Sequence, residues 1–174
     1  MILTDYLRSE HDITWDYARQ CGVRQTPDFD ITNPAHWAAV HKRFVDFGIT
    51  PLVVEPMPNA LHDHIKAGDE KRDECIEAVL KMLPIMAALD IRTICFNFMA
   101  HVGWCRTDHA IPERGGALVT GFDIDKYQPQ GSHITSQQLW DNYAYFIRAV
   151  LPQAERYGIR FALHPDDPPV PRLG

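Results

Sequence analysis

The sequence predicts an α/β fold in which parallel strands alternate with helices. Short apolar runs typical of buried strands recur along the 174 residues. Between them lie stretches with apolar side chains at three- and four-residue spacing, which is typical of helices that pack on a core. This alternation implies βαβ units and a parallel sheet. The chain has the length of one ordinary domain with a substantial core.

The chain up to residue 55 contains three strand candidates and two helix candidates. In chain order they are a weak strand at residues 2–4, a helix at 12–21, an extended segment at 23–26, a helix at 36–47 and a strand at 49–55. Gly22 is the stop signal of the first helix. The second helix follows an N-cap at Asn33 with Pro34 in the first helical position, and it ends at Gly48.

The rest of the chain repeats this pattern. Its expected elements are a helix at residues 69–89, a strand at 91–98, a long loop at 99–134, a helix at 136–157 and a strand at 159–163. Pro84 and Pro152 lie inside the two helices and should kink them. The strands amount to about five of the eight in a closed (β/α) TIM barrel, which typically has ~250 residues. We therefore expect residues 1–174 to form a single incomplete TIM-barrel domain and to be part of a longer sequence.

The composition narrows the class of protein. With 45% hydrophobic and 23% charged residues, the chain is typical of a soluble globular protein. The formal net charge is −6 and no basic run is present, so we expect no nucleic-acid partner. Neither a signal peptide nor an apolar run near the roughly 20 residues of a membrane span occurs, so we expect a cytoplasmic protein without membrane association. Four scattered cysteines are expected to be reduced thiols, namely Cys21, Cys75, Cys95 and Cys105.

Polar residues close three of the predicted strands, where parallel α/β folds carry their working residues. The first strand end is Glu55, which is followed by His62, His64 and Lys66. A Glu at this place could bind a metal ion or a sugar hydroxyl. The alternative interpretation is the solvated start of a loop.

The second strand end is Asn97, followed by the long loop that contains Trp104, Arg106 and Asp108. A loop of this length inside a compact domain is typical of a functional or disordered segment. The Trp104 ring would suit the carbon skeleton of a sugar acid, and the planar fork of Arg106 would suit its carboxylate. The alternative is a loop held by a buried Trp and an Arg–Asp pair.

The third strand end is His164, within the run His-Pro-Asp-Asp-Pro-Pro at residues 164–169. An imidazole at a strand end with carboxylates near by suits a divalent cation. A capped turn is the alternative. No standard nucleophile, phosphate-loop or HExxH signature occurs in the sequence.

Three stretches of the chain resemble the mannonate dehydratase family. Phe-Asn-Phe-Met at residues 96–99 and Trp-Cys-Arg-Thr-Asp at 104–108 are similar to the family's Asn-Phe-Met followed by Trp-Thr-Arg-(Thr/Ser)-Asp. The run at 164–169 is similar to the family's His-Pro-Asp-Asp-Pro-Pro. Residues 55–73 resemble its Glu-Ser-Ile-Pro segment and the Asp-Ile-Lys-x-Gly stretch that follows. The resemblance extends over about residues 49–169.

This resemblance implies dehydration of the sugar acid D-mannonate to 2-keto-3-deoxy-D-gluconate, a step of glucuronate catabolism, in a TIM barrel like that of xylose isomerase. It implies a divalent metal ion, usually Mn²⁺, with His164 as one ligand. Such an ion would acidify the carbon next to the carboxylate and assist loss of hydroxide from the following carbon. On the substrate side the resemblance and the strand ends together place six residues, which are Glu55, His62, Asn97, Trp104, Arg106 and Asp108.

The chain also departs from the family pattern. The family's remaining metal ligands, a Cys, a His and an Asp, and its catalytic Asp-His region are expected on strands beyond residue 174, so this chain alone should not hold a metal ion tightly. Cys105 stands where the family usually has Thr, and the first 48 residues lack its opening Trp-Tyr-Gly pattern. A related enzyme with another sugar-acid substrate is therefore an open alternative.

Two further alternatives come from other functional classes. A sugar isomerase or epimerase on the same barrel would also use a divalent metal ion with His and Glu at strand ends. A catalytically inactive partial barrel could instead bind a partner through the exposed edge of its sheet. The sequence leaves the oligomeric state open between a monomer and a homo-oligomer.

Overall fold

The centre of the fold is a three-stranded parallel sheet. The computed structural model describes residues 2–21, 24–27, 33–128, 133–164, 167–170 and 173. The sheet has the order β3 (Val53–Val54), β4 (Thr93–Phe96), β7 (Arg160–Leu163). Ile94 of β4 lies opposite Val54 of β3 on one side and Phe161 of β7 on the other. The predicted parallel arrangement of these three strands is confirmed, although each is shorter than its apolar run.

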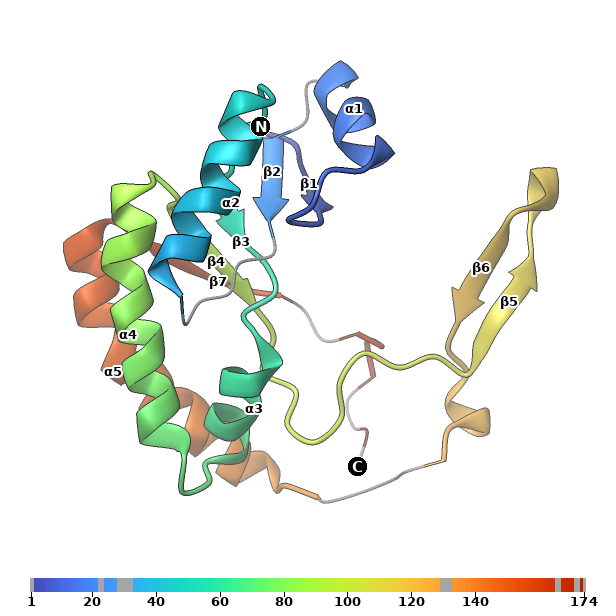
Figure 1. The fold of residues 1–174 in the computed structure, drawn as a ribbon. Coiled ribbons are helices and arrows are strands. Elements are labelled where there is room, and N and C mark those ends of the chain that lie inside the picture. Colours follow the sequence, from blue (N-terminus) through green and yellow to red (C-terminus); the bar gives the residue numbers. More distant parts are fainter. Residues whose placement is uncertain are drawn as a thin grey trace.

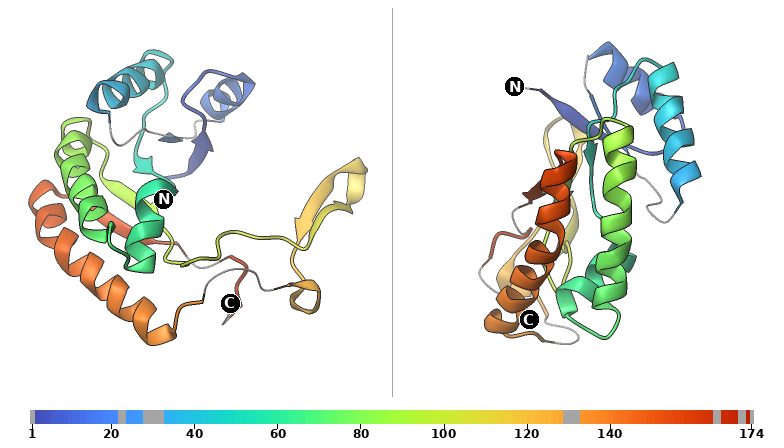
Figure 2. Two further views of the ribbon diagram at one scale, coloured as in Figure 1. Left: turned by 60° about the horizontal axis from the view of Figure 1, so that its bottom comes forward. Right: turned by 90° about the vertical axis from the view of Figure 1, so that its left-hand side faces the viewer.

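Two N-terminal strands extend this arrangement. β1 (Thr4–Leu7) pairs in parallel with β2 (Arg24–Pro27), and β2 lies next to β3. The first strand was predicted at residues 2–4, and β1 begins at the last of these. The second strand was predicted at residues 23–26, of which residue 23 lies outside the described residues. The five parallel strands follow one another in chain order along an arc, with helices on its outer side (Figures 1 and 2). This is an incomplete (β/α) barrel, as the alternating pattern predicts.

Four helices cover the outside of the arc. They are α1 (Ile13–Gln20), α2 (Pro34–Asp46), α4 (Arg72–Ala88) and α5 (Ser136–Tyr157). The Asn33 side chain caps α2 by accepting hydrogen bonds from the next backbone N–H groups, with Pro34 in the first turn as predicted. Thr135 and Gln138 form a capping box that fixes the start of α5. No helix in the described part of the chain has the length and apolar character needed to cross a membrane.

A fifth helix, α3 (Asn59–Ala67), occupies a stretch in which the sequence predicted no helix. The helix ends at Gly68, which adopts the left-handed conformation with a φ of 70°. Its buried face consists of His62, Ile65 and Lys66. Two of these three residues are polar, so the buried face of this helix is not continuously apolar in the sequence.

The predicted long loop at residues 99–134 also contains regular structure. β5 (Asp108–Pro112) and β6 (Leu118–Gly121) form an antiparallel hairpin, with the short 3₁₀ turns η1 (Arg114–Gly116) and η2 (Ile124–Lys126) at its tip and after it. The hairpin projects away from the barrel (Figures 1 and 2). Its apolar residues Leu118 and Val119 are exposed.

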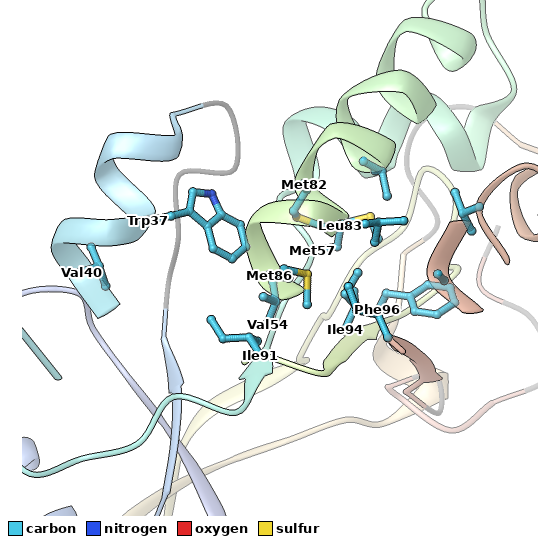
Figure 3. Close-up of a cluster of buried hydrophobic side chains, with 14 of the residues drawn as sticks. Trp37, Val40, Val54, Met57, Met82, Leu83, Met86, Ile91, Ile94 and Phe96 are labelled. Atoms are coloured by element: carbon cyan, nitrogen blue, oxygen red, sulfur yellow. The ribbon is translucent and has the colours of Figure 1, made fainter. Parts of the chain in front are cut away.

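The core lies between the central sheet and helix α4. Met82, Leu83 and Met86 of α4 are fully buried against the side chains of β3 and β4 (Figure 3). Trp37 of α2 and Ile94 of β4 are buried in the same cluster. Full burial of each such side chain is worth roughly 1.5–3 kcal/mol. This core holds the strand ends at fixed positions.

Candidate functional site

The carboxyl ends of the three central strands open into one pocket of about 250 Å³. Glu55 lies just after β3, Asn97 directly follows β4, and His164 directly follows β7. The structure therefore brings these three predicted residues together at one end of the sheet. The complete lining consists of Glu55, Pro56, Cys95, Phe96, Asn97, Met99, Trp104, His164 and Asp167.

Glu55 and Cys95, which both line this pocket, form a pair. The Cys95 thiol hydrogen-bonds to the Glu55 carboxylate, and burial together with that negative charge raises the pKa of Cys95 to about 11. The thiol is therefore protonated at neutral pH and acts as a donor to the carboxylate. Sequence reasoning missed Cys95, although the two-residue period of a strand places it on the same face as Asn97.

Asn97 is held by two donors. Its Oδ1 atom accepts a hydrogen bond from the Met99 backbone N–H at 3.3 Å and from Lys66 Nζ at 3.4 Å. His164 is held through its backbone, since its N–H donates to the Phe96 carbonyl oxygen at 2.7 Å. His164 is therefore tied to the end of β4, and the Asn97 side chain is tied to α3 and to the loop that follows β4.

Arg106 and Asp167 join the loops that follow β4 and β7. Arg106 donates two hydrogen bonds to the Asp167 carboxylate, at 2.9 Å and 2.7 Å. Its guanidinium lies over the Trp104 ring, 4.2 Å from the ring centre. Hydrogen bonding to Arg106 lowers the pKa of Asp167, and the Trp104 side chain and the charge of His164 act in the same direction. The carboxylate is therefore ionised at neutral pH.

The pairing of Arg106 with Asp167 resembles the alternative interpretation of the loop after β4, in which a buried Trp and an Arg–Asp pair hold the loop, but it differs in two ways. The partner of Arg106 is Asp167 and not Asp108, and the Trp104 side chain is 58% exposed rather than buried. The planar fork of Arg106 is thus already occupied by a carboxylate of the protein itself. Binding of a substrate carboxylate by Arg106 stays a prediction.

Three predicted site residues are absent from the lining of this pocket. Arg106 reaches it only through its partner Asp167, and Asp108 and His62 lie elsewhere. Asp108 begins the hairpin, where its carboxylate accepts a 2.9 Å hydrogen bond from Lys126. His62 is only 1% exposed and lies among the rings of Phe96, Phe98 and Phe146. Burial, and then the charge of Lys66, lower the pKa of His62 to about 3. The aromatic surroundings therefore hold a neutral imidazole in the core, and a contact of His62 with the substrate stays a prediction.

The donors for a metal ion are few. In the residues that the structure describes, no group of three or more His, Cys, Asp or Glu side chains is arranged to hold a metal ion. His164 and Glu55 are donors of suitable chemistry that share the pocket. Asp166 of the His-Pro-Asp-Asp run lies outside the described residues.

Comparison with known proteins places the chain in a family. The family model described as D-mannonate dehydratase (UxuA) matches residues 21–132 and 124–174. The mannonate dehydratase of Bacillus subtilis (strain 168) is 28% identical over 211 residues, covering 97% of this chain and 58% of the relative. That of Streptococcus agalactiae serotype Ia is 32% identical over 158 residues, covering 73% and 44%. The chain thus spans about half the length of the curated relatives it matches.

Solved structures confirm the fold. The crystal structure of mannonate dehydratase from Streptococcus suis serotype 2 matches with a TM-score of 0.84 and 24% identity, over 99% of this chain and 56% of that one. D-psicose 3-epimerase from Clostridium cellulolyticum H10 matches with a TM-score of 0.56 and 15% identity, over 94% and 52%. A xylose isomerase-like TIM barrel protein from Mycobacterium smegmatis matches with a TM-score of 0.54 and 14% identity, over 87% and 45%. The fold is that of a TIM barrel, and the chain belongs to the D-mannonate dehydratase (UxuA) family.

Proposed function

We propose that the full-length protein is a hydro-lyase that removes water from a sugar acid, converting D-mannonate to 2-keto-3-deoxy-D-gluconate. The observation that supports this most strongly is the match of the family model to nearly all of the chain beyond residue 20. The pocket at the strand ends supplies a place for the reaction, because it gathers polar groups from three separate strands.

Within this proposal His164 is one ligand of a divalent metal ion. The donor chemistry fits in part, since the pocket offers one imidazole and the Glu55 carboxylate. The two residues fall short of a full coordination set, so further donors are required. When bound, the ion would polarise the substrate carboxylate and a hydroxyl group. We assign manganese as the ion and the cytoplasm as the location on the basis of the resemblance and of the four free cysteines.

The chain's own residues would orient the sugar acid. Asn97 and Glu55 line the pocket and can hydrogen-bond to hydroxyl groups. Trp104 lies on the rim with an exposed ring suited to the carbon skeleton. His62 and Asp108 lie outside the pocket, and we assign neither of them a contact with the substrate.

Arg106 would attract the carboxylate of the sugar acid. A chain of net charge −6 repels an anion at long range, so attraction has to be local. Because Asp167 occupies the Arg106 fork, the substrate carboxylate would have to share or replace that contact. Asp167 is then a competitor that sets how tightly an anion is held.

The test is an assay of the full-length protein with D-mannonate. We expect a 2-keto-3-deoxy acid, detected with thiobarbituric acid, whereas a sugar isomerase or epimerase would release no water and give no such product. His164→Ala should lower the bound metal and abolish turnover together. His109→Ala, at an exposed histidine of the hairpin, is the matched control and should change neither. An active His164→Ala protein with unchanged metal content would end the proposal for this residue.

A further inference from the structure

The amine of Lys66 is buried in an unusual place. Only 4% of its side chain is exposed, although lysine is among the residues that are least often buried. A buried ammonium group is costly unless it is paired, and an apolar side chain of similar length would pack here without that cost. The presence of Lys66 on the inner face of α3 therefore needs an explanation.

Two partners of the Lys66 amine lie in different surroundings. The Nζ atom lies 2.9 Å from Asp63 Oδ1, and the Asp63 side chain is largely exposed. On its other side Nζ donates to Asn97 Oδ1 at 3.4 Å, and Asn97 lines the pocket. Lys66 thus connects the surface of α3 with a residue of the candidate site. His62, one turn earlier, stays neutral and adds no like charge beside the ammonium group.

These contacts decide the orientation of the Asn97 carboxamide. Its Oδ1 atom accepts from both Lys66 Nζ and the Met99 backbone N–H, which uses the two acceptor positions of a carbonyl oxygen. Turning the carboxamide over would place its N–H groups against two other donors. Both contacts are long, so the orientation depends on the pair together. The Nδ2 amino group is consequently the free end of the side chain.

The backbone of Lys66 is held by a residue of α5. Asn142 of α5 donates a 2.9 Å hydrogen bond from Nδ2 to the Lys66 carbonyl oxygen. This contact fixes the end of α3 against α5. A continuous set of hydrogen bonds therefore runs from α5 through Lys66 to Asn97.

We infer that Lys66 is a positioning residue, which holds the Asn97 carboxamide with its amino group toward the pocket. That side of the pocket then presents N–H donors and is specific for an oxygen acceptor, such as a hydroxyl or carboxylate oxygen of a sugar acid. The identity of this ligand rests on the proposed function, whereas the positioning of Asn97 does not.

The first experiment measures positioning without any substrate. In the full-length protein, ¹⁵N relaxation should give an order parameter for the Asn97 side-chain amide that is typical of a rigid group. Lys66→Met keeps the length and apolar stem of the side chain but removes the donor, and the order parameter should then fall below about 0.6. Lys42→Met removes an exposed surface amine and is the matched control. An equally rigid Asn97 amide in the Lys66→Met protein would overturn the inference.

The second experiment is a double-mutant cycle in the dehydration assay. Lys66→Met should raise KM for the sugar acid about threefold to tenfold, the equivalent of one neutral hydrogen bond, with a smaller change in kcat. In an Asn97→Ala background the same substitution should have no further effect, because the group that Lys66 positions is gone. A loss of the same size in both backgrounds would show that Lys66 acts on the fold and not through Asn97. If the protein dehydrates no sugar acid, the proposed function fails and the relaxation measurement still decides the role of Lys66.

Discussion

Gly68 offers a direct test of how α3 is anchored. It ends the helix with a φ of 70°, and a Cβ atom at this position would lie 2.4 Å from Asn142 Oδ1. The Asn142 side chain would have to move, and it would then lose its hydrogen bond to the Lys66 carbonyl oxygen. We predict that Gly68→Ala lowers the free energy of unfolding for two separate reasons.

The magnitude follows from these two costs. An L-residue in the left-handed conformation costs about 1–2 kcal/mol. Breaking the Asn142 hydrogen bond, with a partly buried carbonyl oxygen left unpaired, costs roughly 1–3 kcal/mol. The free energy of unfolding should therefore fall by roughly 2–5 kcal/mol.

Gly158 provides the matched control. It ends α5 with a φ of 65°, but the nearest atom to an added Cβ is Arg92 Nη1 at 3.8 Å, which is an ordinary contact. Gly158→Ala should carry the backbone cost alone, about 1–2 kcal/mol. In an Asn142→Ala background, where no side chain blocks the Cβ, Gly68→Ala should also cost only that amount.

Urea unfolding followed by tryptophan fluorescence would compare the free energy of unfolding of these four variants with that of the unsubstituted protein. A Gly68→Ala protein no less stable than Gly158→Ala would show that the added Cβ atom displaces nothing. An unchanged cost of Gly68→Ala in the Asn142→Ala background would show that the collision with Asn142 is not its cause.

Three further predictions concern pH, the substrate and the metal ion. The pKa of His62 falls from 6.5 to about 3 on folding, so between these values the unfolded chain binds a proton that the folded chain does not. The free energy of unfolding should therefore decrease as the pH falls from 6.5 toward 3, by up to about 1.4 kcal/mol per pH unit. Urea unfolding at several pH values would measure this dependence, and the free energy should depend less steeply on pH in His62→Leu. Arg106→Lys keeps the charge but loses the planar fork, so steady-state kinetics at saturating metal should show a higher KM or a lower kcat; unchanged constants would exclude Arg106 from carboxylate binding. Removal of metal with a chelator should abolish dehydration in the full-length protein, and Mn²⁺ should restore it; full activity after verified removal would contradict a metal-dependent reaction.

The sequence predicted the elements whose signals are local. Helix α5 begins and ends as expected, because Thr135 and Gly158 are strong capping signals. The strand ends at Glu55, Asn97 and His164 were predicted to meet because parallel strands place their carboxyl ends together, and they line one pocket.

The features that the sequence did not predict either lack an apolar signal in the local sequence or depend on contacts between distant residues. Helix α3 was missed because the polar residues His62 and Lys66 occupy much of its buried face. The ion pair of Arg106 with Asp167 joins residues 61 positions apart, and no local pattern indicates such a partner. The hairpin was missed because Leu118 and Val119 project into solvent, where alternation of apolar and polar residues is not required.

The chain-order arrangement of the strands has a consequence for synthesis. Each parallel strand lies beside the one that precedes it in the sequence, from β1 and β2 through β3 and β4 to β7. A nascent chain leaving the ribosome therefore meets a partner that is already present, and each βα unit can add to the growing edge without waiting for later residues. Chains arrested on the ribosome after α4 should already resist protease cleavage within β3 and α2. If these segments are cleaved as fast as in an unfolded chain, the arc assembles only after β7 has emerged.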